Sequence, residues 1–158
     1  MHENAFGEPE GKVVAQLACD IMNDETAKPL LSLVVENNDA IIGHIIFSSV
    51  NIESSEELSA YILAPLAVSK KCKKTGLGTK LINHGLATLK AREADIVLVL
   101  GDPNYYKRAG FKADHSVEAP YKLEYPEAWM ALELKSGMLA KAKGVARCAF
   151  SLNSPEHW

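Results

Sequence analysis

LAPLAVSKKCKKTGLGTKLINHGLATL, residues 63–89, predicts a strand, a basic turn and a helix in succession. The apolar run Leu63–Val68 has the length of a buried strand, and Pro65 inside it marks a bulge or a point where strand pairing stops. Small and apolar residues then recur at spacings of three and four, which predicts one buried stripe along an amphipathic helix. They are Leu77, Leu81, Ile82, Gly85, Leu86 and Leu89.

The turn between this strand and helix is basic and rich in glycine. Five of the seventeen Lys and Arg residues lie within Lys70–Lys80, and Gly76 and Gly78 fall at the predicted start of the helix. A helix start has unpaired N–H groups and the positive end of the helix dipole, so bare backbone there favours an anion of phosphate size. The alternative is a tight turn with solvated lysines, and these residues alone leave both readings open.

Two common phosphate loops are excluded by the spacing. A Walker loop needs glycine five residues before a Gly-Lys-Ser/Thr, but Lys73 stands at that place and Thr79 follows Gly78. The dinucleotide fingerprint needs a third glycine where this chain has Leu81. The turn therefore belongs to neither class.

Composition is that of one soluble globular domain, residues 1–158, with 47% hydrophobic and 23% charged residues. A net charge of −3 argues against nucleic acid as the main partner. Cys19, Cys72 and Cys148 form no CxxC pair, which favours a reducing cytoplasm and no metal site. Cys72 lies among lysines and is either a reactive thiol or an incidental loop residue. We see no signal peptide or membrane span.

Upstream of the basic turn, the pattern predicts one helix and two strands. Apolar residues from Val13 to Ile21 follow a helical spacing. Leu30–Val35 and Ile41–Val50 read as a hairpin joined by a polar turn, and the second strand is apolar on both faces, so it belongs inside the sheet. His44 in this strand is expected to be a hydrogen-bonded core residue, with a catalytic role as the alternative.

Downstream, Ile96–Leu100 has the continuous apolar character of a central parallel strand. Asp102 suits a helix N-cap, Pro103 the first helical position, and Gly110 the position after the helix, so a short helix is predicted between them. Residues from Phe111 onward and the run 129–134 read as the last two strands, and residues 137–158 receive no assignment. Because both helices start where parallel strands end, a ligand crevice is expected there.

Two motifs carry a family resemblance. Leu66-Ala67-Val68 followed by Lys73-Lys74-Thr75-Gly76-Leu77-Gly78 resembles motif A of the Gcn5-related N-acetyltransferases, with Lys73 in place of the usual Gln or Arg. Tyr106–Phe111 has the Tyr-x-x-x-Gly-Phe spacing of their motif B. The phrase 100–106, with 63–68 upstream, is similar to the YhbS-like branch of this superfamily.

The resemblance implies an α/β (α+β) fold of the GNAT acyl-CoA N-acyltransferase type. A mixed, mostly antiparallel sheet would have flanking helices and splayed fourth and fifth strands, with acetyl-CoA in the cleft. Family members usually begin with a strand before the first helix, whereas this chain starts near that helix. The first strand is thus expected to be absent or supplied differently, and strand Leu30–Val35 to be an exposed edge or covered by a second subunit in a homodimer.

The implied activity is direct transfer of an acetyl group from acetyl-CoA to a primary amine of a small-molecule acceptor, without a metal. Tyr106 would be the catalytic acid that protonates the leaving thiolate. Cofactor binding would fall to Leu66, Ala67, Val68, Lys73, Lys74, Thr75, Gly76, Leu77, Gly78, Thr79, Tyr105 and Arg108. The general base would be Glu56, Glu57, His44 or an ordered water. The rival interpretations are a catalytically degenerate acyl-CoA sensor and a nucleotide-phosphate binder without CoA.

Overall fold

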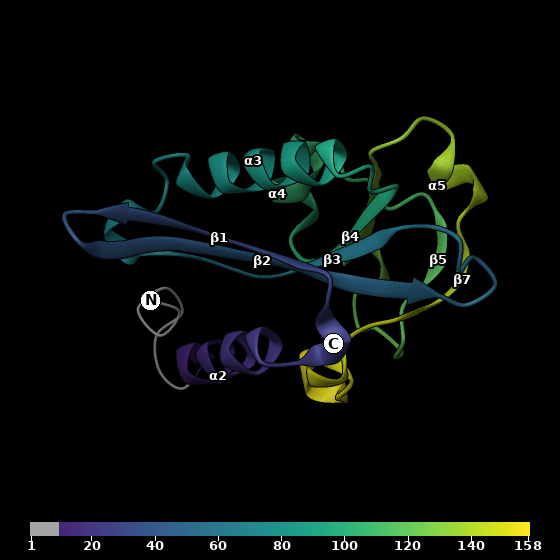
Figure 1. The fold of residues 1–158 in the computed structure, drawn as a ribbon, viewed down its shortest axis with the longest axis horizontal. Helices are drawn as coiled ribbons and strands as arrows, with labels where there is room; N and C mark the ends of the chain where they lie inside the picture. The colour runs from purple at the N-terminus through teal and green to yellow at the C-terminus, as the bar shows by residue number, and fades with distance from the viewer. Residues whose placement is uncertain (1–9) are drawn as a thin grey trace.

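The computed structural model describes residues 10–158, which form a curved mixed sheet between two helical layers (Figure 1). The helices are α2 (Glu10–Met22), α3 (Leu77–Ala91), α4 (Pro103–Tyr106) and α5 (Met138–Lys141). The strands are β1 (Leu30–Asn37), β2 (Ala40–Ile52), β3 (Ala60–Val68), β4 (Ile96–Leu100), β5 (Ser116–Glu118), β6 (Trp129–Glu133) and β7 (Lys143–Arg147). Short 3-10 helices are η1 (Glu25–Ala27), η2 (Lys70–Cys72), η3 (Lys107–Ala109), η4 (Pro126–Ala128), η5 (Phe150–Leu152) and η6 (Pro155–His157).

The sheet runs in the order β5-β7-β2-β3-β4-β6, with β1 also paired to β2. β2 is long enough to pair with β1, β3 and β7, which confirms the interior position predicted for the strand at 41–50. β3 and β4 are parallel, and β4 and β6 are antiparallel. The helices α3 and α4 follow the carboxyl ends of β3 and β4, so the crevice expected at that edge is in place.

β3 and β4 separate part of the way along their length. Their pairing ends at Leu63 and Val99, yet β3 continues to Val68, where it pairs only with Gly43 of β2. The Ala64–Pro65 peptide is cis and the β2–β3 register shifts opposite it, which confirms the irregularity predicted at Pro65. This splay leaves one backbone edge of residues 64–68 without a strand partner among the described residues.

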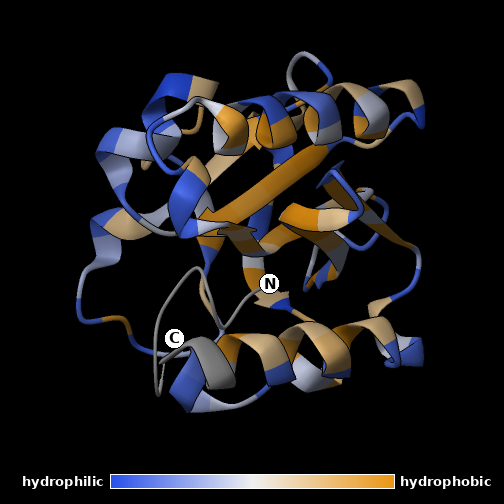
Figure 2. Cartoon of the chain, turned by 90° about the vertical axis from the view of Figure 1, so that its left-hand side faces the viewer, coloured by the Kyte–Doolittle hydropathy of each residue, from blue (hydrophilic) through white to orange (hydrophobic). Residues whose placement is uncertain are grey.

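Each face of the sheet carries its own hydrophobic core. Leu81, Ile82, Leu86 and Leu89 of α3 pack on one face, as their predicted stripe requires. Ile21 of α2 belongs to the core on the opposite face, together with residues of the segment that follows β7. Hydrophobic colouring is therefore concentrated between the helical layers (Figure 2). Among residues 10–158, no helix has both the length and the apolar character needed to cross a bilayer.

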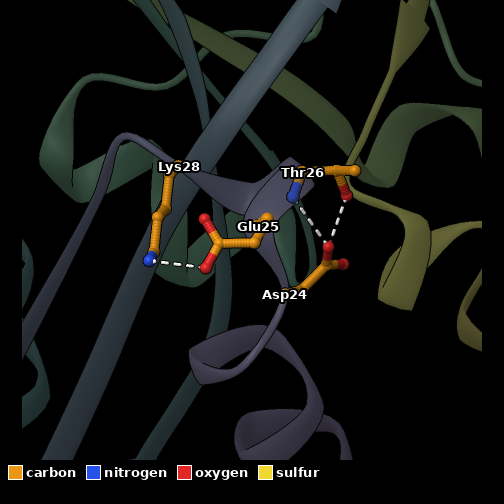
Figure 3. Close-up of polar contacts among 4 residues, drawn as sticks. All are labelled: Asp24, Glu25, Thr26 and Lys28. Atoms are coloured by element: carbon orange, nitrogen blue, oxygen red, sulfur yellow. Dashed lines mark hydrogen bonds and ion pairs between the residues drawn. The ribbon is translucent and has the colours of Figure 1, made fainter.

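The segment that connects α2 to β1 forms hydrogen bonds with η5, near the C-terminus. Asp24 caps η1 by accepting a hydrogen bond from the Thr26 amide at 2.8 Å (Figure 3). The other carboxylate oxygen of Asp24 accepts from the Ser151 amide and hydroxyl at 2.8 and 2.7 Å, and the Phe150 amide donates to the Thr26 hydroxyl at 2.8 Å. These bonds hold the last segment against α2, below the sheet in Figure 1.

One expectation for the second half of the chain is corrected. The predicted strand from Phe111 is wrong, because Phe111 is a buried core residue, Lys112 forms only an isolated bridge to Ala131, and β5 begins at Ser116. β5 also pairs with β7 rather than with the neighbouring β6. β7 lies in the unassigned region 137–158, whose short polar-apolar runs gave no strand signal. The local sequence there has only a weak preference for strand, and β7 forms because it pairs with the distant strands β2 and β5.

The start of the chain matches the prediction in part. The predicted first helix is α2, and the hairpin is β1 and β2. Within residues 10–158, β1 pairs only with β2, so its other edge has no strand partner. Residues 1–9, on which the expectation of a missing first strand partly falls, lie outside the described residues.

Candidate active site

The turn before α3 has the conformation of an anion site. Gly76 occupies the N-cap in the left-handed region, at φ 84°, where L side chains are strained. Glycine has no side chain that could cap the helix, and α3 begins at Leu77 with its first N–H groups directed out of the helix end. Bare donors and the helix dipole thus converge at this point.

An open cavity of about 480 Å³ lies over this turn. Its lining is basic: Lys73 and Lys74 come from the turn, and Arg108 comes from the segment after β4. The complete lining is Val68, Cys72, Lys73, Lys74, Gly76, Leu77, Gly78, Thr79, Tyr105 and Arg108. Two segments about thirty residues apart in sequence are therefore joined at one site, as the two motifs predicted. Below, we call this the phosphate-side cavity.

Tyr105 closes this cavity against the helix start. A Cβ at Gly78 would overlap the Tyr105 hydroxyl, so the tyrosine lies directly on the glycine backbone. The absence of a side chain at Gly78 is what permits this close approach. Tyr105 is thus a wall of the phosphate-side cavity, and it also packs against the edge of the core beneath α3.

Three of the predicted cofactor residues lie outside the phosphate-side cavity. Leu66 lines a different cavity, the Ala67 side chain is buried, and Thr75 is exposed, with its hydroxyl donating to the Cys72 carbonyl. Leu66 and Ala67 pair with β2 but do lie on the stretch of β3 that has no pairing with β4. Cys72, which the sequence analysis left as either reactive or incidental, is part of the lining. No sequence signal marked it beyond its position in the basic turn.

Tyr106 points away from its neighbour. It lines the cavity that also contains Leu66, while it packs, like Tyr105, against the core beneath α3. Its ring packs edge-on against Tyr105 and Phe111, with centroids 5.1 and 5.8 Å apart. Burial, aided by the charge of Asp102, raises the pKa of the Tyr106 phenol far above its ordinary value. Its hydroxyl consequently remains a proton donor at neutral pH.

The three side chains considered as general base lie elsewhere. Glu56 and Glu57 are exposed in the loop before β3, at the opposite end of that strand from the splay. His44 Nε2 is 2.7 Å from the Ser32 hydroxyl on the neighbouring strand β1, and burial lowers its pKa. It is a partly buried, hydrogen-bonded histidine, close to the structural role expected. None of the three lines either cavity.

The cavity containing Tyr106 has a volume of about 470 Å³ and is the part of the site that the sequence did not reveal. Its walls come from α2, from the splayed part of β3, from Leu100 and from the segment after β7. Glu156, His157 and Trp158 line it, although residues 137–158 gave no assignment. Below, we call it the α2-side cavity.

Two cavities thus border the splayed part of β3, one beside a basic helix start and one beside a largely buried tyrosine. Comparison with known families agrees with this geometry. Residues 29–113, which include both motifs, match the model of the acetyltransferase (GNAT) domain. The chain belongs to the GNAT acetyltransferase family.

Relatives within this family are similar over most of the chain. The Escherichia coli N-acetyltransferase YjhQ is 33% identical over 85% of this chain and 77% of its own length. Among solved structures, E. coli YhbS in complex with CoA gives a TM-score of 0.85 at 28% identity, covering 97% of this chain and 83% of YhbS. A Brucella melitensis GNAT acetyltransferase in complex with acetyl-CoA gives a TM-score of 0.69 at 30% identity. The match covers 96% of this chain and 86% of the Brucella chain. The YhbS-like branch is therefore the right subdivision.

Proposed function

We propose that this GNAT protein moves the acetyl group of acetyl-CoA directly to a primary amine of a small-molecule acceptor. The observation that carries the proposal is the splay of β3 from β4, since residues of the splayed part of β3 line both the phosphate-side cavity and the α2-side cavity. A thioester that reaches between the strands from the basic side would meet Tyr106, and an acceptor would approach from the α2-side cavity. The CoA and acetyl-CoA in the two similar structures support this choice of donor.

The basic side suits the nucleotide end of CoA. The pyrophosphate would accept hydrogen bonds from the backbone N–H groups of the turn Lys73–Thr79, with Lys73, Lys74 and Arg108 supplying positive charge. The pantetheine arm would run along Leu66, Ala67 and Val68. Its amides would pair with the backbone edge that the splay leaves open, as an added strand does.

The reaction would be a direct attack on the thioester. A neutral amine adds to the acetyl carbonyl, and a backbone N–H near Val68 stabilises the developing oxyanion. The thiolate then leaves, and Tyr106 donates a proton to the sulfur. The raised pKa of Tyr106 keeps its hydroxyl protonated at neutral pH, so that the proton is available for donation.

The proposal is tested by incubating the protein with radiolabelled acetyl-CoA and a panel of amines, together with calorimetry using CoA and ATP. We expect labelled amide product, and we expect CoA to bind more tightly than ATP. CoA binding without transfer to any amine would favour a degenerate acyl-CoA sensor. ATP binding as tight as that of CoA would favour a nucleotide-phosphate binder.

We also propose that the protein is cytoplasmic. Its three cysteines, which are free thiols, support this proposal.

A further inference from the structure

The α2-side cavity is apolar except at one rim. Val14 and Leu17 of α2, the splayed part of β3 and Leu152 supply hydrocarbon surface, and Trp158 adds an aromatic wall. The polar side chains in the lining are Tyr106, Glu156 and His157. A volume of about 470 Å³ lies in the range of sites that enclose one small molecule.

The polar rim contains a largely buried imidazole beside an exposed carboxylate. The His157 side chain is only 13% exposed, whereas the Glu156 side chain is 71% exposed. His157 Nε2 lies 3.6 Å from Glu156 Oε1, so the imidazole and the carboxylate are neighbours at this rim. An imidazole alternates between its neutral and charged forms near neutral pH, which suits a group that removes a proton from an amine.

This rim is held in place by specific contacts. Asp24 binds the Ser151 amide and hydroxyl, and the Trp158 indole N–H donates to the Leu152 carbonyl at 2.9 Å. The Trp158 ring also packs edge-on against Trp129, with centroids 5.4 Å apart. The wall that carries His157 is thus anchored to the start of η1 and to β6 of the sheet.

The two cavities differ in charge. The phosphate-side cavity is lined by Lys73, Lys74 and Arg108, which suit the anionic cofactor. The described lining of the α2-side cavity contains a carboxylate, Glu156, and neither lysine nor arginine. A single ammonium group is attracted to the rim, while the apolar floor excludes further charges, which would lose their hydration there.

We propose that the α2-side cavity is the acceptor site, that it takes a primary amine carried on one apolar or aromatic body, and that His157 accepts the proton that the amine loses. This inference rests on the proposed acetyl transfer and adds the substrate class and the base. The sequence had suggested Glu56, Glu57, His44 or an ordered water as the base and not His157, which lies 46 positions beyond the end of motif B at Phe111.

The proton and electron balance is complete with these groups. The ammonium gives one proton to neutral His157, and the amine lone pair forms the C–N bond to the acetyl carbon. Collapse of the tetrahedral intermediate breaks the C–S bond, and its electron pair goes to sulfur. Tyr106 protonates the sulfur and becomes a tyrosinate. The nitrogen then gives up a second proton, which returns the tyrosinate to its neutral form. The net products are the amide, CoA thiol and one proton on His157.

The site is tested by bisubstrate conjugates, in which the CoA sulfur is joined through an acetyl bridge to an amine. We expect the phenethylamine conjugate to bind at least about tenfold more tightly than CoA, and the spermidine conjugate to stay within about threefold of CoA. A gain for spermidine, or none for phenethylamine, would overturn the inference. Loss of CoA binding itself would instead overturn the proposed function.

A charge placed on the cavity floor gives a matched comparison. Val14→Glu should abolish the gain of the phenethylamine conjugate and leave CoA affinity within about threefold. Gln16→Glu, at an exposed position on the same helix, should change neither affinity. An undiminished gain in Val14→Glu would place the amine elsewhere.

The role of His157 is tested with phenethylamine as substrate. His157→Gln should lower kcat by roughly a hundredfold and remove the acidic limb of the pH profile, while conjugate affinity changes by less than about threefold. Glu156→Gln should mainly raise KM. A pH profile unchanged in His157→Gln, a parallel loss of conjugate affinity, or no acetylation of phenethylamine by the wild type would overturn the assignment of His157.

Discussion

At the residue scale, the absence of a side chain at Gly78 keeps the phosphate-side cavity open. Gly78→Glu places bulk and negative charge against the Tyr105 hydroxyl and the α3 N-terminus. We predict that CoA affinity falls by tenfold or more, about 1.4 kcal/mol, in calorimetry. Asn83→Glu adds the same charge on the exposed face of α3 and should leave affinity unchanged. Equal affinities for wild type and Gly78→Glu, with the fold intact, would rule out this cavity as the CoA site.

The adjacent tyrosines offer a second comparison at the residue scale. Tyr106→Phe removes one hydroxyl from the α2-side cavity, so turnover should fall roughly ten- to a thousandfold while acetyl-CoA affinity changes less than about threefold. Tyr105→Phe should leave turnover nearly intact, because Tyr105 faces the phosphate-side cavity. Steady-state kinetics with calorimetry measures both quantities. Equal losses in the two variants would reassign Tyr106 to packing.

At the scale of elements, hydrogen bonds between the η1 segment (Asp24 and Thr26) and η5 (Phe150 and Ser151) hold the rim of the proposed acceptor site. We call this set of bonds the η1–η5 joint. Asp24→Asn removes the charge that binds Ser151 and Thr26, and we predict a loss of about 1–3 kcal/mol in urea unfolding. Glu25→Gln is the control, because its ion pair with Lys28 at 2.9 Å is exposed and should contribute less than about 1 kcal/mol (Figure 3). Similar losses in both variants would contradict a specific role for Asp24.

The same joint has a predictable pH dependence. Burial alone would raise the pKa of Asp24, but hydrogen bonds from Ser151 and Thr26 outweigh it and lower the pKa from 3.8 to about 2. A depressed pKa in the folded state means that the charged carboxylate stabilises the fold above about pH 4 and that this stability is lost as pH falls toward 2. Unfolding midpoints of wild type and Asp24→Asn should therefore converge over that range. A constant difference down to pH 2 would contradict this assignment.

At the scale of the whole molecule, β1 is the edge that matters for association. It pairs only with β2 among the described residues, and Val34 on it and Ile41 beside it are exposed. Unpaired strand edges invite association, so we predict that the β1 edge is either open in a monomer or covered by a second copy. Light scattering and amide exchange along Leu30–Val35 distinguish the two. A strictly monomeric particle with protected edge amides would contradict both.

Local features of this chain followed from its sequence alone. The spacing from Leu77 to Leu89 determined α3, the glycines determined where it starts, and Asp102, Pro103 and Gly110 determined the short helical segment after β4. The family and its fold followed too, because motifs A and B are short and contiguous. Each of these signals depends on contacts between residues a few positions apart.

Tertiary structure alone decided how the two cavities are divided. The adjacent Tyr105 and Tyr106 face different cavities, and the α2-side cavity joins Val14 to Trp158 from opposite ends of the described chain. The strand β7 and the η1–η5 joint likewise connect segments about a hundred residues apart. Periodicity reports which face of an element is buried, but not which distant element will cover it. A site built between layers is therefore decided by packing.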